Sequence, residues 1–229
     1  SFTKAIRVRQ WVKNLLVFAP LVLAHKFQDL KAASASIQAC LAFSLCASSV
    51  YLLNDLLDLA ADRAHRSKRR RPFAAADLSL GVGIIAAPLF LLIGTAIGFQ
   101  ISYGFAIILT IYYLITLAYS FKLKSIVLVD GIVLATLYTL RIFAGSIATG
   151  IHLSKWLLIF ALFFFYSLAL AKRATELLYL EKNKTKIKTR GYFVSDVRQT
   201  MIQGVVSGYL SVLVFAFYLS SPAIKSTYP

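Results

Sequence analysis

Long apolar stretches recur along this chain of 229 residues and leave few folds open to it. Several approach the roughly 20 residues that an α-helix needs to cross the hydrocarbon core of a bilayer. Hydrophobic residues make up 59% of the sequence and charged residues only 15%, which excludes an ordinary soluble domain. A soluble helical bundle would need more polar surface than these segments leave. We therefore expect an all-α, polytopic transmembrane bundle, with seven spans at residues 11–25, 33–54, 78–99, 103–119, 127–149, 156–178 and 201–220.

The basic residues indicate an orientation. The formal net charge is +16, and Lys and Arg concentrate in alternate loops, which is typical of cytoplasmic loops. These loops also suit anionic lipid headgroups, whereas nucleic-acid binding lacks a soluble module to carry it. The N-terminus is therefore expected in the cytoplasm. The cytoplasmic loops then hold Lys4, Arg7, Arg9, Lys13, Arg63, Arg66, Lys68, Arg69, Arg70, Arg71, Lys122, Lys124 and the basic residues from Lys172 to Arg198.

Three carboxylates and an amide end the second apolar stretch. Asp55, Asp58 and Asp62 lie at i, i+3 and i+7, so on a continuous α-helix they would share one face. Clustered carboxylates at a membrane boundary repel one another unless a cation lies between them. Oxygen ligands of this kind suit Mg²⁺ held through a substrate diphosphate. We therefore interpret Asn54, Asp55, Asp58 and Asp62 as metal ligands, and the alternative is a solvated helix end.

Further charges lie inside or at the ends of apolar stretches, where each is costly unless it is paired or faces water. Asp130 and Arg141 are separated by about three helical turns and project from one face, with Tyr138 near that face. A second group at helical spacing is Lys172, Arg173 and Glu176. Both groups are candidates for a polar site. The alternative is that Arg–carboxylate pairs lock helices together.

The acidic run Asn54-Asp55-x-x-Asp58-x-x-x-Asp62 is one of several motifs that point to a family. The others are residues 9–14 (RQWVKN), 62–73 (DRAHRSKRRRPF), Asp130 with 137–141 (LYTLR), 172–177 (KRATEL) and 190–192 (RGY). Together they resemble the UbiA superfamily of intramembrane transferases, in its polyprenyl-phosphate (decaprenyl-phosphate) phosphoribosyltransferase branch. The resemblance implies one transmembrane catalytic domain over residues 1–229. It also implies nine transmembrane helices in the complete protein, so we expect the last pair to be missing from a C-terminally incomplete chain.

Two departures from the superfamily pattern stand out. Members that use prenyl diphosphates typically have a second Asp-x-x-x-Asp motif, but here Asp130 is followed at that spacing by Leu134. The missing carboxylate counts against a prenyl diphosphate donor and suits the phosphoribosyl branch. Ala76 stands where relatives usually have Gly, which bears only on the local loop conformation.

The resemblance implies Mg²⁺-dependent transfer of 5-phosphoribose from phosphoribosyl diphosphate (PRPP) to a polyprenyl phosphate, with release of diphosphate, for cell-envelope precursors of the arabinan type. The chemistry suits the residues, because Mg²⁺ and Lys or Arg stabilise the leaving diphosphate while an oxocarbenium-like centre forms. The lipid phosphate is already ionised and needs no strong base. One alternative is an aromatic prenyltransferase of quinone synthesis. Another is a transporter, which would need charges spread across the membrane depth.

We expect the catalytic residues to be Asp55, Asp58, Asp62 and Arg141. The expected substrate-binding residues are polar groups near the cytoplasmic side: Gln10, Lys13, Asn14, Asn54, Arg71, Lys122, Asp130, Tyr138, Lys172, Arg173, Glu176 and Arg190. Because the lipid tail must stay in hydrocarbon, the site should also open sideways to the bilayer. Candidate walls for the tail are Phe160, Phe163, Phe164 and Phe165, although ordinary helix packing explains them equally well. The expected location is the inner (plasma) membrane, with PRPP, the lipid phosphate and the membrane as partners.

Overall fold

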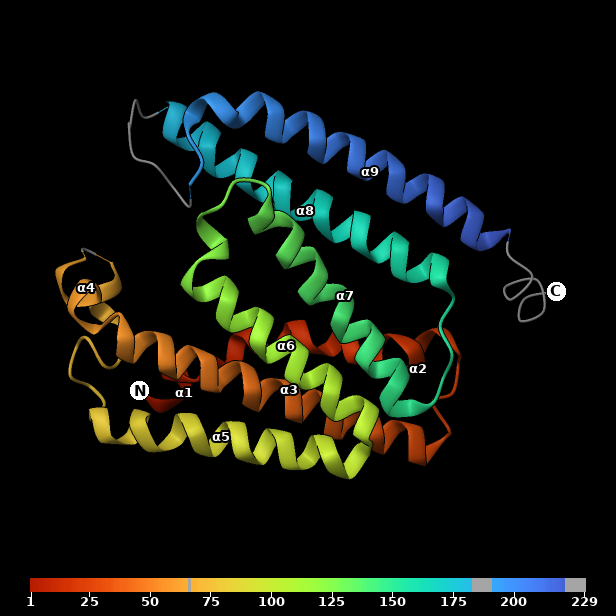
Figure 1. The fold of residues 1–229 in the computed structure, drawn as a ribbon, viewed down its shortest axis with the longest axis horizontal. Coiled ribbons are helices and arrows are strands. Elements are labelled where there is room, and N and C mark those ends of the chain that lie inside the picture. The colour runs from red at the N-terminus through yellow and green to blue at the C-terminus, as the bar shows by residue number, and fades with distance from the viewer. Residues whose placement is uncertain (66, 183–190, 221–229) are drawn as a thin grey trace. The chain divides into compact units, whose positions relative to one another are not determined.

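The computed structural model describes residues 1–65, 67–182 and 191–220. The described part contains nine α-helices and four 3₁₀-helices and no β-strand, so the predicted all-α fold is confirmed (Figure 1). Arg190, an expected substrate ligand, and Arg66 lie outside the described residues. The elements in chain order are α1 (Phe2–Ala5), η1 (Val8–Phe18), α2 (Ala19–Leu23), α3 (Leu30–Leu57), α4 (Leu59–Ala64), η2 (Lys68–Arg70), α5 (Leu80–Ile101), α6 (Tyr103–Phe121), η3 (Leu123–Ser125), α7 (Val129–Thr149), α8 (Lys155–Lys182), η4 (Val194–Asp196) and α9 (Val197–Leu219).

Six of the seven expected spans form long helices. Within the described residues, α3, α5, α6, α7, α8 and the segment of η4 and α9 are long and apolar enough to cross a membrane. The first expected span is wrong as a continuous α-helix, because the 3₁₀-helix η1 ends at Phe18 and the short α2 follows with Pro20 in its first turn. Proline lacks a backbone N–H and has a fixed φ, so it begins a helix more readily than it continues one.

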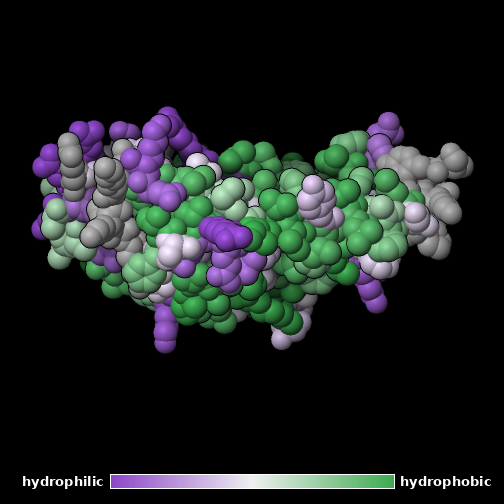
Figure 2. Space-filling model, turned by 90° about the horizontal axis from the view of Figure 1, so that it is seen from above, coloured by the Kyte–Doolittle hydropathy of each residue, from purple (hydrophilic) through white to green (hydrophobic). Residues whose placement is uncertain are grey.

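Large apolar side chains remain exposed along these helices. Ile85 of α5 is 68% exposed and Val212 of α9 is 65% exposed. Apolar residues also dominate the face of the molecule shown in Figure 2. Water would disfavour so much apolar surface, whereas lipid tails accommodate it. With six candidate spans in the described residues, the chain is an integral membrane protein.

The chain forms two compact units. Unit 1 comprises Ser1–Leu117 with Ala144–Ile151, and unit 2 comprises Ala118–Phe143 with His152–Pro229. Within unit 1, α3 packs against α5, and within unit 2, α8 packs against α9; each pair runs antiparallel (Figure 1). Each unit is therefore organised around one helical hairpin-like pair.

Hydroxyl groups on α3 hold the first polar segment of unit 1 in place. Asn14 Nδ2 donates to Ser44 Oγ at 2.9 Å, and Trp11 Nε1 donates to Ser48 Oγ at 3.1 Å. Ser48 Oγ in turn donates to the backbone oxygen of Ile6 at 2.9 Å. Buried polar groups are stabilised only when they are hydrogen-bonded, so these contacts fix the segment before Pro20 against α3.

Gly145 allows a close backbone approach in unit 1. A Cβ placed on this residue would lie 2.0 Å from the backbone oxygen of Val17 and 3.2 Å from Cδ of Pro20. No side chain fits at that distance, so only glycine lets the end of α7 contact the first segment.

A buried ion pair organises unit 2. Arg173 on α8 donates through Nε to Oδ2 of Asp130 on α7 at 2.5 Å, and Tyr119 donates its hydroxyl to Oδ1 of the same carboxylate at 2.7 Å. Arg173 also pairs with Glu176 one turn along α8. Asp130 is 0% exposed and Arg173 is 1% exposed. The two buried charges are tolerated because each is neutralised by, and hydrogen-bonded to, the other.

The segment after the undescribed residues 183–190 is anchored to the loop before α7. Gly191 has φ +81, and a Cβ on it would lie 1.9 Å from the backbone oxygen of Ser125. The Tyr192 hydroxyl accepts the N–H of Leu128 at 2.9 Å, and Leu128 itself has the left-handed φ of 67°. Burial raises the pKa of the Tyr192 phenol, so this hydroxyl stays protonated. The contact therefore stabilises a strained backbone next to Asp130.

Replacing Gly145 with alanine should destabilise the protein. The added Cβ meets backbone atoms that cannot rotate away, and overpacking of this kind costs about 1–3 kcal/mol. The matched control is Gly81→Ala on α5, where a Cβ meets nothing within 4 Å. Thermal unfolding of both variants in detergent measures the effect. Equal melting temperatures for the two variants would contradict the close approach.

Removing one partner of the buried Asp130–Arg173 pair should destabilise the protein more than replacing both partners with neutral residues. Arg173→Gln leaves the Asp130 carboxylate without its cation, and removing one partner of a buried pair costs about 3–5 kcal/mol. The double variant Asp130→Asn/Arg173→Gln should be more stable than Arg173→Gln alone, because no buried charge is left. Denaturant unfolding in mixed micelles gives the comparison, with the exposed neighbour Lys172→Gln as control. A double variant as unstable as the single one would refute the pairing.

Candidate functional site

The expected acidic face of a single helix is wrong, because the helix is interrupted in the middle of the motif. The α3 helix ends at Leu57, Asp58 forms a turn, and α4 begins at Leu59. Backbone hydrogen bonds continue across the turn, since the Asp58 N–H donates to Asn54 O at 2.9 Å and the Asp62 N–H donates to Asp58 O at 2.8 Å. The three carboxylates therefore have different environments. Asp55 and Asp62 are buried, whereas Asp58 is exposed and Asn54 is half-buried.

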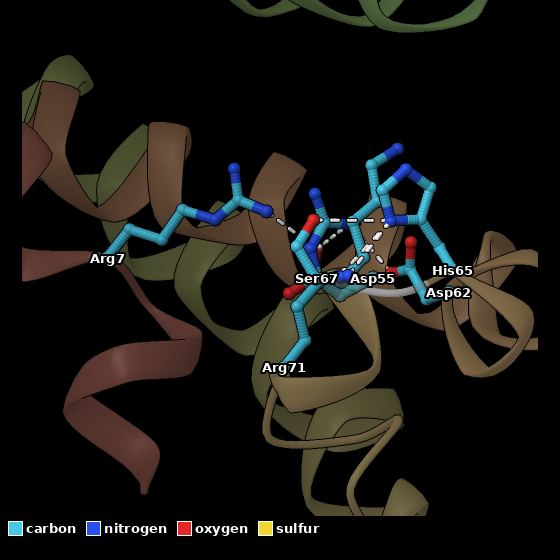
Figure 3. A network of polar contacts seen from close by, with 7 residues as sticks. Arg7, Asp55, Asp62, His65, Ser67 and Arg71 are labelled. Carbon is cyan, nitrogen blue, oxygen red and sulfur yellow. Dashed lines mark hydrogen bonds and ion pairs between the residues drawn. The ribbon is translucent and has the colours of Figure 1, made fainter.

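Arg71 bridges the two buried carboxylates. Its Nη1 donates to Asp55 Oδ1 at 3.1 Å and to Asp62 Oδ2 at 2.7 Å (Figure 3). The exposed fractions of the Asp55 and Asp62 side chains are 3% and 2%, so these two carboxylates are not solvated. The contacts of Arg71 are with the carboxylates themselves, and its assignment as a substrate-binding residue stays a prediction.

A second arginine, Arg7, was missed as a site residue by the sequence analysis, which used it only for topology. Its Nη2 donates to Asp55 Oδ1 at 2.7 Å, so this one oxygen accepts from two guanidinium groups. The residue has the left-handed conformation φ 53°, ψ 50°, and its guanidinium lies 4.6 Å from the ring centre of Tyr51. The sequence signal was weak, because Arg7 precedes the recognisable 9–14 motif by two positions.

The loop that returns Arg71 to the acids is shaped locally. His65 Nδ1 accepts from the N–H groups of Ser67 at 3.2 Å and Lys68 at 3.4 Å, which turns the chain back (Figure 3). Phe73 is 1% exposed and packs with Leu52 of α3 in an apolar cluster of unit 1. The buried aromatic ring thus holds the backbone next to Arg71. Ala76, where relatives usually have Gly, adopts φ 61°, so the loop keeps a left-handed residue despite the Cβ.

One oxygen of the cluster has no partner. Asp62 Oδ1 is buried and accepts no hydrogen bond from the described residues. A buried, unpaired carboxylate oxygen is unusual, and it fits a ligand position for a hard cation such as Mg²⁺. No three His, Cys, Asp or Glu side chains of the described residues gather as a complete metal site. Asp62 Oδ1 is thus a candidate ligand, and the metal assignment stays a prediction.

The other expected residues of unit 1 have different environments. Asn14 is 1% exposed and anchors the first segment to Ser44, which is a structural contact. Gln10 and Lys13 are half-exposed, so their side chains can reach a ligand. Their assignment to substrate stays a prediction.

In unit 2, Asp130 and Arg173 are enclosed with each other in the buried ion pair. Their assignment as substrate-binding residues stays a prediction. Arg141 is buried, donates through Nη1 to Leu137 O at 2.5 Å, and lies 5.4 Å from the ring centre of Tyr138.

A groove on α8 contains two further expected residues. It has a volume of about 600 Å³ and is lined by Lys172, Thr175, Glu176, Tyr179 and Leu180. These residues recur at helical spacing on one face of α8. Lys172 is exposed and Glu176 is half-buried beside Arg173, so the groove combines an available cation with apolar walls. Lys122 is also exposed, in the turn before η3.

The aromatic side chains proposed as walls for a lipid tail pack largely among themselves. Phe160 stacks on Phe164 with ring centres 5.5 Å apart and also contacts Phe215 of α9 at 5.2 Å. Phe165 stacks on Tyr138 at 4.9 Å. Helix packing accounts for these contacts, and the sideways opening stays a prediction.

Comparison with known proteins gives several relatives, of which two are described. Protein y4nM of Sinorhizobium fredii is 39% identical over 97% of this chain and 44% of its own length. Decaprenyl-phosphate phosphoribosyltransferase of Mycolicibacterium smegmatis is 37% identical over 81% of this chain and 59% of its own length. The chain thus spans about half the length of these relatives.

A UbiA homolog from Archaeoglobus fulgidus, solved with GPP and Mg²⁺, has a TM-score of 0.77 over 98% of this chain and 81% of that chain. At 18% identity this likeness shows the fold alone. The family model of the UbiA prenyltransferase family matches residues 15–224. Because that match covers nearly all of the described helices, the chain belongs to the UbiA prenyltransferase family.

Proposed function

We propose that the protein transfers 5-phosphoribose from PRPP to a polyprenyl phosphate and releases diphosphate. The observation that carries the proposal is the cluster in which buried Asp55 and Asp62 contact Arg7 and Arg71. The arginine side chains are 29% and 27% exposed, so they remain accessible to an anionic ligand. Such a cluster binds phosphate through its guanidinium groups and a divalent cation through its carboxylates. The name of the Mycolicibacterium smegmatis relative supports the pair of substrates.

The state of Asp130 favours phosphoribosyl transfer over aromatic prenyl transfer. Leu134 replaces the second carboxylate of the usual motif, and Arg173 neutralises the one that remains. A second metal–diphosphate site at this position would have to break a fully buried ion pair. Prenyl transfer is the second candidate, because the Archaeoglobus fulgidus homolog binds GPP and Mg²⁺.

In the proposed reaction, an oxygen of the lipid phosphate forms a bond to C1 of the ribose while the bond from C1 to the diphosphate breaks. The lipid phosphate is ionised near neutral pH, so no side chain has to remove a proton. Arg7 and Arg71 bind oxygens of the leaving diphosphate, because a guanidinium offers several N–H donors in one plane. Catalysis then consists of positioning and charge stabilisation.

The carboxylate side of the cluster holds the cation. Asp55 and Asp62 supply buried oxygens, and Asn54 and Asp58 lie near them in the chain where α3 ends and α4 begins. Mg²⁺, when bound, supplies neutralisation of the charge that develops on the leaving group. PRPP is water-soluble and the cluster borders the basic residues 68–71, so we place the reaction at the cytoplasmic face of the plasma membrane.

The remaining cations are assigned to the phosphates of the two substrates. Lys172 lies beside the groove on α8, whose apolar walls suit the first part of a lipid tail. The other residues proposed to contact substrate are Gln10, Lys13, Lys122, Tyr138, Arg141 and Arg190. Which of them bind the donor and which bind the acceptor is decided by separate Michaelis constants of alanine variants.

The activity can be tested with radiolabelled PRPP. Purified protein in detergent with Mg²⁺ and a polyprenyl phosphate should produce a labelled lipid and free diphosphate. The matching polyprenol, which lacks the phosphate, should stay unlabelled because it has no ionised nucleophile. Failure to label the lipid phosphate, together with prenylation of a phenolic acceptor by a prenyl diphosphate, would show that the second candidate is correct.

Variants of the three aspartates should separate the metal role from the structural one. Asp55→Asn, Asp58→Asn and Asp62→Asn should each lower kcat/KM by about a hundredfold or more, because each removes a charge from the site. Only Asp55→Asn and Asp62→Asn should also lower the melting temperature, since these two carboxylates pair with arginines, whereas the exposed Asp58 pairs with none of the described arginines. Wild-type kinetics in Asp58→Asn would remove that residue from the ligand set.

A further inference from the structure

The charges of the acidic cluster of unit 1 cancel before any ligand arrives. Asp55 Oδ1 accepts from Arg7 at 2.7 Å and from Arg71 at 3.1 Å, and Asp62 Oδ2 accepts from Arg71 at 2.7 Å. Two carboxylates therefore face two guanidinium groups in a site where both acids are almost completely buried. A divalent cation that entered alone would add two positive charges beside two existing ones. Its entry would be opposed by the repulsion between like charges at short range.

The cluster nevertheless keeps one position for a cation. Asp62 is 1% exposed, and its Oδ1 has no hydrogen-bond partner among the described residues. In Figure 3 this carboxylate contacts Arg71 through one oxygen only. A buried carboxylate oxygen without a partner costs free energy that a ligand recovers. The guanidinium groups thus balance the charge of the cluster without completing its coordination.

We propose that Arg7 and Arg71 are internal counter-cations, which release the carboxylates only when a diphosphate group arrives together with the metal ion. The inference rests on the proposed function and deepens it, since it concerns how the donor's diphosphate binds. Each guanidinium moves from a carboxylate oxygen to a diphosphate oxygen, and the freed carboxylate oxygens bind the metal. Metal and diphosphate therefore bind with strong positive coupling, and either one alone binds weakly.

The local structure of Arg7 suits this movement. Its backbone is held by the turn that leads into η1, and its guanidinium rests on the ring of Tyr51 rather than inside a closed pocket. The side chain is 29% exposed, in contrast to the enclosed Arg173 of unit 2, which is 1% exposed. An arginine stacked on an aromatic ring retains a favourable contact when its hydrogen-bond partner changes.

The coupling is measurable without any enzymatic turnover. Equilibrium dialysis of the purified protein in detergent, with Mn²⁺ alone, inorganic diphosphate alone, and their preformed complex, gives three affinities. We expect the complex to bind the wild-type protein at least about tenfold more tightly than either component alone. Equal affinity for Mn²⁺ with and without diphosphate would overturn the inference.

Substitution of Arg7 provides the decisive arm. Arg7→Gln removes one counter-cation, so Mn²⁺ alone should bind more tightly and the gain from diphosphate should shrink. Arg7→Lys keeps the charge and should restore weak binding of Mn²⁺ alone. Arg69→Gln is the matched control, because it removes the same charge from an exposed side chain of η2 and should change neither affinity. If Arg7→Gln behaves like Arg69→Gln, Arg7 is not a counter-cation.

Two further measurements distinguish a loss of metal binding from a loss of folding. Asp62→Asn should weaken binding of Mn²⁺ both alone and with diphosphate, since it removes the unpaired oxygen's charge. The melting temperature of each variant confirms that it is folded. Coupling without phosphoribosyl transfer would leave this inference standing and reject the proposed function. Transfer without coupling would reject the inference alone.

Discussion

Pairing of buried carboxylates with arginines is the interaction on which both units depend. Asp55 and Asp62 in unit 1 and Asp130 in unit 2 are all buried, and each contacts a guanidinium group. A carboxylate removed from water inside a membrane protein is costly, and the cost falls only when a cation and hydrogen-bond donors surround it. The helices that carry these acids are therefore held where their arginine partners can reach them.

The Asp–Arg pairs of the two units differ in how exposed their arginine side chains are. This difference distinguishes a structural pair from a pair that a ligand can reach. Arg173 is enclosed with Asp130, and Tyr119 donates to the second carboxylate oxygen. Both oxygens of Asp130 therefore have a hydrogen-bond partner. In unit 1 the arginines are partly exposed and Asp62 Oδ1 has no partner among the described residues, so the network seen there is incomplete. A complete buried network stabilises one arrangement of helices, whereas an incomplete one can exchange partners with a ligand. Aspartate–arginine pairs thus hold helices together in unit 2 and form the candidate site in unit 1.

The breaks in helical structure place the candidate site as much as the helices do. The turn at Asp58 redirects α4 so that Asp62 meets Arg71, and the left-handed Arg7 precedes a 3₁₀-helix that cannot form a regular span. Helix interruptions in membrane proteins are tolerated where side chains satisfy the freed backbone groups, as Ser48 of α3 does for the backbone oxygen of Ile6. The candidate site therefore lies next to irregular points of the chain.

The sequence by itself determined the membrane class, the long helices and the acidic motif. Apolar length predicts a span directly, because each residue contributes independently to transfer into lipid. The tertiary structure alone decided which charges meet. Arg7 lies 48 positions from Asp55, and Arg173 lies 43 positions from Asp130. No local pattern encodes such a distance, since partners this far apart are selected by the packing of whole helices. The interruption at Asp58 was not visible in the sequence either, because the residues on both sides of it fit a continuous helix.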